Sequence, residues 1–250
     1  MNDSYWIAWI VLAFGCGSLP FGMIIARAKG VDLRAVGSGN TGATNVGRAL
    51  GRGWGIACFL LDAGKGATPV LVSGALMGVL GMEAGAAGPS AEWGWMAVGI
   101  AAILGHVYSP FLNFKGGKGV ATACGALLAL YPVMTYPVLI GGGLFAICVL
   151  ATGYMSLASM VAAASVPVSV GLIGILEGVP DGGAAGGVVP GLCAGLLIAF
   201  TVVWRHRGNL RRIRSGSEPR VLGRGRMRTP SQPAGGVEPS KQDTTSTNRP

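Results

Sequence analysis

Residues 120–150 read VATACGALLALYPVMTYPVLIGGGLFAICVL and contain no charged side chain. One helix of this length would extend about 46 Å, whereas the hydrocarbon core of a bilayer is about 30 Å thick. Pro132 and Pro137 interrupt the stretch, and proline inside a helix removes a backbone hydrogen bond. We therefore predict two short membrane helices that turn near residues 131–137.

The rest of the chain has the composition of a polytopic membrane protein. It has 250 residues, of which 51% are hydrophobic and 12% are charged, and its mean hydropathy is +0.56. Soluble domains carry about 25% charged residues, so this chain has too few charges to cover a surface exposed to water. Further apolar spans are predicted at 5–26, 54–81, 93–112, 155–176 and 188–204. The predicted fold class is an all-α membrane protein with seven transmembrane helices.

The positions of the basic residues predict the orientation. The net charge is +9, and 11 of the 19 Lys and Arg follow Trp204. Lys and Arg accumulate in short cytoplasmic loops. Seven spans with the N-terminus outside place these residues in the cytoplasm and leave Asp3, Glu83, Glu92, Glu177 and Asp181 outside, without one Lys or Arg. We therefore expect no nucleic-acid partner, a membrane domain over 1–222, and a disordered cytoplasmic tail over 223–250.

The first polar cluster is VGSGNTGATNVGRALGR, residues 36–52. It is too rich in Gly, Ser, Thr and Asn for an amphipathic helix, and its glycines let backbone N–H groups approach an anion. Arg48 supplies a bidentate phosphate partner. The candidate binding residues are Ser38, Gly39, Asn40, Thr41, Asn45 and Arg48. The same composition also fits a solvated turn that leads into a capped helix.

The second polar cluster is FKGGKGVATA, residues 114–123. Two lysines, three glycines and the start of a helix predict a phosphate cradle of exposed N–H groups, with Lys115, Gly116, Gly117, Lys118 and Gly119 as candidates. It is not a Walker A loop, because Leu112 replaces its first glycine and Gly119 its Ser/Thr. The alternative is a basic cytoplasmic loop with glycine caps.

The third polar cluster, RHRGNLRRIRSGSE, covers residues 205–218. His206 and Asn209 are three residues apart and can share one helix face. A histidine there could donate to a phosphate oxygen or move a proton near pH 7. The alternative is an arginine-rich anchor for lipid headgroups.

Two further ionisable features lie within apolar spans. Asp62 and Lys65 are three residues apart, and we interpret them as an ion pair within one helix. His106 lies about two turns before the lysine loop and could orient it. The five cysteines fall in apolar stretches without ligand spacing, and we predict neither a metal site nor a cofactor.

Four strings, GSGNTGATNVGR, LDAGKG, GHVYSPFLNFKGGKGVAT and RHRGNLRRIRSGSE, resemble in order and spacing the bacterial membrane acyl-phosphate:glycerol-3-phosphate acyltransferase family. The resemblance covers most of residues 5–220. It implies a seven-helix enzyme of the bacterial inner membrane whose active site faces the cytoplasm. Such an enzyme transfers a fatty acyl group from acyl phosphate to the 1-position of glycerol 3-phosphate and makes lysophosphatidic acid.

The resemblance also implies roles for individual residues. Ser38 and Arg48 match the residues that help hold the phosphate of glycerol 3-phosphate, and His206 and Asn209 match a motif of the same polar pocket. Residues 116–119 match a glycine-rich loop associated with the acyl-phosphate donor. Leu210 departs from the family's more frequent Ile, and the chain beyond about residue 222 is extra.

The resemblance implies substrate assistance, in which a substrate phosphate takes the hydroxyl proton. An acyl phosphate is a mixed anhydride with a good leaving group, so positioning and charge stabilisation are the main requirements. No Ser-His-Asp constellation is identified in the sequence. The alternatives are a membrane transporter of a phosphorylated metabolite and a lipid-binding membrane protein without catalysis. The predicted partners are glycerol 3-phosphate, acyl phosphate and membrane lipid.

Overall fold

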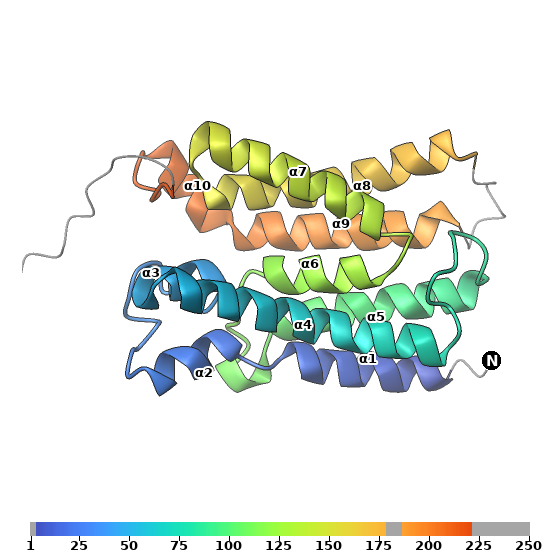
Figure 1. Ribbon diagram of the computed structural model, residues 1–250, viewed down its shortest axis with the longest axis horizontal. Helices are drawn as coiled ribbons and strands as arrows, with labels where there is room; N and C mark the ends of the chain where they lie inside the picture. Colours follow the sequence, from blue (N-terminus) through green and yellow to red (C-terminus); the bar gives the residue numbers. More distant parts are fainter. Residues whose placement is uncertain (1–3, 179–186, 222–250) are drawn as a thin grey trace, which may run out of the picture.

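The computed structural model describes residues 4–178 and 187–221, and these residues form helices and loops without a strand (Figure 1). The helices are α1 (Ser4–Gly17), α2 (Phe21–Ala28), α3 (Ala43–Leu50), α4 (Arg52–Leu76), α5 (Pro89–Val107), α6 (Val120–Ala129), α7 (Thr135–Thr152), α8 (Met155–Leu176), α9 (Val188–Arg205) and α10 (Arg207–Arg214), with a 3₁₀ turn η1 (Pro110–Leu112). The predicted tail over 223–250, Asp3 and Asp181 lie outside the described residues.

Six helical segments in the described residues are long and apolar enough to cross a bilayer. They are Ser4–Ala28, Arg52–Leu76, Pro89–Leu112, Thr135–Thr152, Met155–Leu176 and Val188–Arg205. The expected span at 54–81 ends earlier, because α4 stops at Leu76. The remaining apolar helix, α6, has 10 residues and is about 15 Å long, half of the bilayer core.

The expected division of residues 120–150 into two helices is confirmed, but the expectation that both are short is wrong. α6 is short, whereas α7 has 18 residues and the length of a span. The reason is the place of Pro137, which lies in the first turn of α7. A proline is tolerated there because the first N–H groups of a helix have no intrahelical partner.

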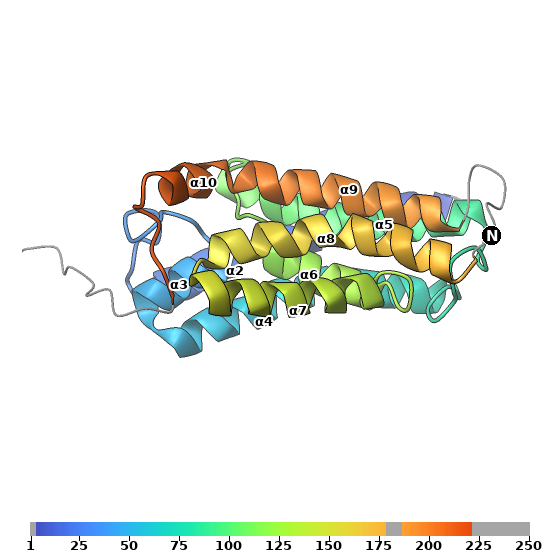
Figure 2. The same ribbon diagram turned by 90° about the horizontal axis from the view of Figure 1, so that it is seen from above.

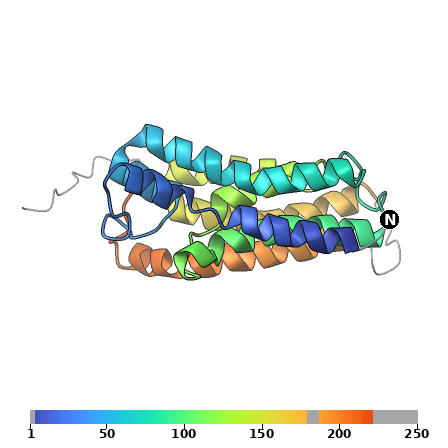
Figure 3. The ribbon, with the colours of Figure 1, turned by 90° about the horizontal axis from the view of Figure 1, so that it is seen from below.

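The long helices run side by side in one bundle, seen from two further directions in Figures 2 and 3. α5 is its centre: it contacts α1, α4, α6 and α9, and 67% of its most apolar 18 residues are buried, against 11% in α7. α6 lies inside the bundle against α4 and α5. α7 packs mainly on α8 and leaves most of its surface for lipid.

Close packing of α6 on α4 depends on glycine. A Cβ on Gly125 would lie 1.9 Å from the carbonyl oxygen of Ala63, and one on Gly66 would lie 2.4 Å from that of Thr122. Only glycine lets the two backbones approach this closely, as is usual between membrane helices. The contact fixes the depth of α6 in the bundle.

The first span is broken between α1 and α2, at Ser18–Pro20. Pro20 has no N–H, and the break frees backbone carbonyls inside the bundle. Ser109 donates a hydrogen bond to Ser18 O at 2.6 Å, and Lys65 Nζ donates to Leu19 O at 2.5 Å. Buried side chains therefore satisfy the backbone of the broken span, as required in lipid.

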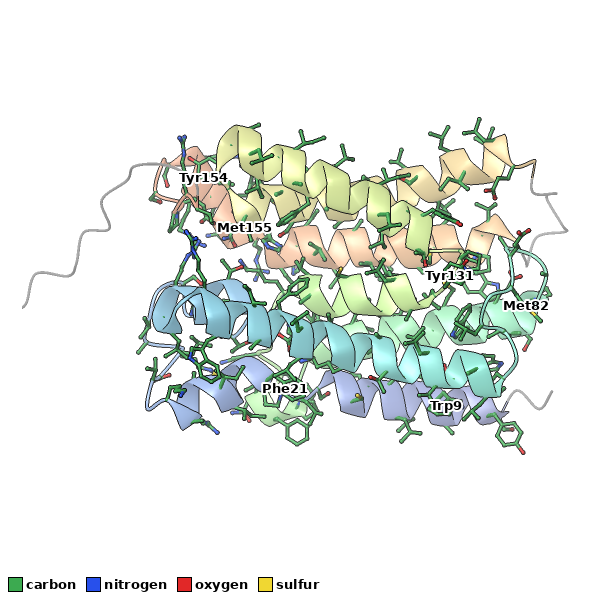
Figure 4. All side chains as sticks on the ribbon, viewed as in Figure 1. Trp9, Phe21, Met82, Tyr131, Tyr154 and Met155 are labelled. Carbon is green, nitrogen blue, oxygen red and sulfur yellow. The ribbon has the colours of Figure 1, made fainter. Side chains whose placement is uncertain are left out.

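The two ends of the bundle differ in character. α2, α3 and α10 lie at one end, and the loop after α4 lies at the other (Figure 1). Tyr154 and Met155 are at the end with α10, and Met82 and Tyr131 are at the opposite end (Figure 4). The acidic Glu83 and Glu177 line a cavity at that opposite end together with Tyr131.

Candidate functional site

A polar cavity of about 130 Å³ lies beyond the N-terminal end of α6. The short helix leaves this space free, and its first residues, Val120 and Ala121, line the cavity wall. All three polar clusters of the sequence reach it. Its sequence-predicted lining residues are Ser38, Asn40, Asn45, Arg48, Lys118, Gly119, His206 and Asn209.

A second hollow of about 370 Å³ adjoins the cavity. Ser38, Asn40, Lys118 and Asn209 border both spaces, so the two hollows share one wall. The outer hollow also contains the candidates Gly39, Thr41, Lys115 and Gly116, and the arginines Arg34, Arg205 and Arg212. Of the 13 candidate site residues, Gly117 alone lines neither space.

The first cluster is half loop and half helix. The expectation that residues 36–52 are too polar for an amphipathic helix is wrong for residues 43–50, which form α3. The alternative of a turn that leads into a helix agrees with this part of the structure, although no side chain caps α3. Asn45 explains the fold: its Nδ2 donates to Leu33 O and Val36 O, and its Oδ1 accepts from Ser38 N at 2.9 Å. The buried Asn45 amide therefore holds the preceding loop, with Ser38 at the cavity and Arg48 on the helix beside it.

Asn40 also has a local hydrogen bond. Its Oδ1 accepts from Gly42 N at 2.9 Å, at the residue that precedes α3. Such an Asx turn fixes the entry to the helix. Arg48 is exposed on α3, so its guanidinium is in position to reach an anion in the cavity.

Two N–H groups of the second cluster bond to the C-terminal end of α5, which the sequence did not predict. Gly116 N donates to Val107 O at 3.1 Å, and Gly117 N donates to His106 O at 3.2 Å. These two N–H groups are therefore engaged, and the expectation that they cradle a phosphate is wrong. The donors that this cluster offers to the cavity are Lys118 and the first N–H groups of α6. The first N–H groups of a helix have no partner within the helix and can bind an anion.

Arg205 fixes the other side of this loop. Its guanidinium donates to Gly116 O at 2.6 Å and to Gly117 O at 3.2 Å. Gly119 then turns the chain into α6 with a φ of +82°, a conformation that favours glycine. The loop therefore has a fixed backbone path before Lys118 enters the cavity.

The third cluster contributes a hydrogen-bonded chain. Lys118 Nζ donates to Asn209 Oδ1 at 2.6 Å, and Asn209 Nδ2 donates to Glu218 Oε1 at 2.6 Å. Ser156 donates to the same oxygen at 2.7 Å, and Arg212 Nε donates to Glu218 Oε2 at 2.8 Å. The buried carboxylate of Glu218 thus orients the amide that receives Lys118.

His206 and Asn209 both line the cavity, as their spacing predicts, but the helix breaks between α9 and α10 at His206. The sequence analysis assigned no role to Glu218 or Ser156. Glu218 is the single acid of the basic third cluster, and this is a signal that could have singled it out. Ser156 carries no such signal, because it is an ordinary serine at the start of an apolar helix.

Burial changes the ionisation of two site residues. It lowers the pKa of Lys118 to about 8; Glu218 opposes this shift, whereas Arg212, Arg48 and Arg205 increase it. Burial also lowers the pKa of His206 to about 4, helped by the charge of Lys118. His206 is thus neutral at pH 7, which argues against proton transfer by His206 near that pH in the unliganded site.

The tautomer of His206 follows from its backbone contact. Its Nδ1 lies 2.8 Å from Val202 O, so the neutral ring carries its proton on Nδ1. Nε2 is then an acceptor and suits a hydroxyl group better than a phosphate oxygen.

The predicted ion pair contributes one of its two members, Asp62, to the cavity wall. Lys65 Nζ lies 2.7 Å from Asp62 Oδ1, and both side chains are buried. His106 Nδ1 lies 3.7 Å from the same carboxylate oxygen. Asp62 and His106 both line the cavity, whereas Lys65 points away toward the break in the first span.

Fold and site together define an integral membrane protein with a cavity at one end of a helical bundle, lined by both basic and acidic side chains, and a basic hollow beside it. The family model for glycerol-3-phosphate acyltransferase matches residues 7–216. The chain belongs to the glycerol-3-phosphate acyltransferase family.

Relatives and solved structures agree with this assignment. The glycerol-3-phosphate acyltransferase of Geobacter sulfurreducens is 46% identical over 213 residues, which cover 84% of this chain and 94% of the relative. That of Aquifex aeolicus is 39% identical and covers 84% and 96%. A crystal structure of PlsY, an integral membrane glycerol 3-phosphate acyltransferase, in its glycerol 3-phosphate form has a TM-score of 0.71 at 36% identity and covers 88% of this chain and 96% of its own.

Proposed function

We propose that this protein transfers a fatty acyl group from acyl phosphate to the 1-hydroxyl of glycerol 3-phosphate and releases lysophosphatidic acid and phosphate. The observation that carries the proposal is one cavity in which Arg48, Lys118 and the N-terminus of α6 meet. Each of the three favours a phosphate group. Family membership supports the same reaction.

The reaction needs positioning more than a protein nucleophile. The 1-hydroxyl oxygen forms a bond to the acyl carbon, the bond from that carbon to the bridging phosphate oxygen breaks, and phosphate leaves. A substrate phosphate oxygen takes the hydroxyl proton. Arg48 and Lys118 hold phosphate charge, Ser38 and Asn209 orient the ligands, and the neutral His206 accepts a hydrogen bond from the glycerol moiety. Asn45 and Asn40 hold the first loop in place.

The apolar side of the cavity suits the acyl chain. Phe59 of α4, Phe145 of α7 and Met155 of α8 are large apolar side chains that line it. Phe59 is 39% exposed, so its ring borders both the cavity and the outer surface of the bundle. We assign this side as the path by which the acyl chain reaches the site from the bilayer.

In the proposed arrangement the chain has seven crossings in the bacterial inner membrane, with α6 as a half-length seventh helix buried in the bundle. The N-terminus is outside, and the site faces the cytoplasm. Residues 1–222 form the enzyme, and 223–250 form a tail that is not needed for the reaction.

A transporter of a phosphorylated metabolite remains the alternative. A transporter needs free polar ligands at membrane depth. Asp62 and Lys65 pair with each other, and Lys65 also bonds to Leu19 O, so these charges are engaged within the fold. This arrangement supports the enzyme over the transporter.

The test is acyl transfer by the protein reconstituted in lipid. Palmitoyl phosphate, palmitoyl-CoA and palmitoyl-acyl carrier protein are supplied in parallel with labelled glycerol 3-phosphate. We expect lysophosphatidic acid from palmitoyl phosphate alone. Product from the thioesters would overturn the donor assignment, and uptake of glycerol 3-phosphate into vesicles without any product would favour the transporter.

A further inference from the structure

The loop that carries Lys118 lies directly on the side chain of His106. Gly117 is buried, and its φ is not in the positive range that favours glycine. Its backbone conformation alone would therefore accept alanine. A Cβ on Gly117 would nevertheless lie 2.1 Å from His106 Nε2, 2.9 Å from Cε1 and 3.1 Å from Cδ2. Its three nearest atoms all belong to the imidazole ring. The ring therefore occupies the space in which a side chain at residue 117 would lie.

The ring of His106 lies beside the buried ion pair of Asp62 and Lys65. Its Nδ1 faces Asp62 Oδ1 at 3.7 Å, and the ion pair with Lys65 fixes that carboxylate. The void between these groups and the loop is about 10 Å³, which is space for no more than one water. On the side of this void the ring of His106 therefore has little space into which it could move.

The loop is also held from above by Arg205, which binds the carbonyl oxygens of Gly116 and Gly117. The peptide units before Lys118 thus lie between a guanidinium and an imidazole. Their orientation decides where the Lys118 side chain and the first N–H groups of α6 meet the cavity. A shift of 1 Å at such a place can cost about a hundredfold in rate.

We propose that His106 is a positioning residue of this enzyme: its ring, which fills the space beside Gly117, sets the position of the 116–119 loop and thereby that of Lys118. This proposal rests on the proposed acyl transfer. His106 acts on the substrates through the loop and forms no bond to them.

The test is a double-variant cycle on kcat/KM for palmitoyl phosphate. Gly117→Ala should lower kcat/KM about a hundredfold, because the new methyl group pushes the loop off the ring. His106→Ala should lower it about tenfold, because the loop keeps its backbone bonds but loses its contact with the ring. In the His106→Ala background, Gly117→Ala should cause no further loss and should restore part of the activity, because the methyl group enters the vacated space.

Gly116→Ala is the matched control. A Cβ on Gly116 would lie 2.0 Å from His106 O and 2.9 Å from Val107 O, which are backbone atoms that His106→Ala does not remove. The loss caused by Gly116→Ala should therefore persist in the His106→Ala background. Equal behaviour of the two glycine variants, or additive losses for Gly117→Ala and His106→Ala, would overturn the proposal.

Two readouts separate this proposal from the proposed function. Wild-type turnover tests the function alone. Stabilisation of the protein against thermal unfolding by inorganic phosphate tests the loop without turnover, and it should follow the same pattern across the five variants. If the wild-type protein transfers no acyl group but the stabilisation pattern is found, the proposed reaction is wrong and the role of His106 stands. If the wild-type protein is active but the pattern is not found, the proposed role of His106 is wrong.

Discussion

At the residue scale, the site separates side chains that hold the fold from side chains that face the cavity. Asn45 and Arg48 lie three residues apart on α3, yet Asn45 is 1% exposed and bonds to the loop, whereas Arg48 is exposed beside the cavity. Both belong to one glycine-rich string. Their different surroundings give them different expected responses to substitution.

Arg48→Ala should raise the KM for glycerol 3-phosphate about 10- to 100-fold, because a hydrogen bond to a charged group contributes about 1.5–3 kcal/mol. Its thermal unfolding should change little, since Arg48 is exposed. Arg52→Ala is the control, because Arg52 is an equally exposed arginine at the start of α4 that does not line the cavity. Steady-state kinetics in lipid measure both. Unchanged KM in well-folded Arg48→Ala would remove Arg48 from the site.

The ionisation of Lys118 should make the KM for the phosphate substrates depend on pH in the alkaline range. Its pKa of about 8 lies below the ordinary 10.5, so its charge is lost as the pH rises through about 8, and the KM for the phosphate substrates should rise there. Stability should not fall in parallel, because between pH 8 and 10.5 the unfolded state binds the additional proton and unfolding becomes less favourable as the pH rises.

The conservative variant Lys118→Arg checks this assignment. Arginine keeps its charge throughout this range, so the alkaline rise in KM should disappear even if the maximal rate falls. The measurement is KM between pH 6 and 9.5 for both proteins. The same rise in Lys118→Arg would assign it to another group, such as the phosphate substrates.

At the element scale, α6 determines the site by being short. It has ten residues, and its N-terminal end borders the cavity and supplies N–H donors to it. Its depth depends on the glycine contact with α4. A helix of full length in the same position would fill the cavity.

Gly125→Ala should therefore destabilise the bundle by about 1–3 kcal/mol, the usual cost of overpacking, because its methyl group meets the backbone of Ala63. Gly142→Ala on α7 is the control, since no atom lies within 4 Å of its added Cβ. Thermal unfolding in detergent compares the two. Equal stability would show that α6 can shift along α4 without loss.

At the scale of the whole molecule, the two ends of the bundle predict its orientation. In a variant without the native cysteines, Glu83→Cys should react with an impermeant maleimide in intact right-side-out vesicles, and Ser215→Cys should react only after permeabilisation. Both residues are exposed. Glu83 lines a cavity with Tyr131, and Ser215 directly follows α10, which lies at the opposite end of the bundle (Figures 1 and 4). The reverse pattern would invert the proposed topology and place the site outside.

The length of chain that the enzyme needs is also predicted. Val221 N donates to Gly153 O at 2.8 Å, and Glu218 binds Asn209, so residues up to 221 hold the site. Truncation after residue 222 should leave kcat/KM unchanged, and truncation after residue 216 should abolish activity. Activity assays on the two reconstituted proteins check this, and loss of activity in the longer one would assign a role to the tail.

The amino-acid sequence by itself determined the membrane class, the division of residues 120–150, the ion pair of Asp62 with Lys65 and the three polar clusters. These features depend on local properties, which are apolar run length, proline position and residue spacing. The family resemblance also followed from the order of the motifs.

Only the tertiary structure decided how the clusters combine. It assigned the glycine N–H groups of residues 116 and 117 to backbone bonds, joined Lys118 to Glu218 through Asn209, and placed the ring of His106 beneath Gly117. The longest of these contacts, between Lys118 and Asn209, joins residues 91 positions apart in the chain. Spacing along the sequence cannot specify them, because they depend on which helices pack together and at what depth.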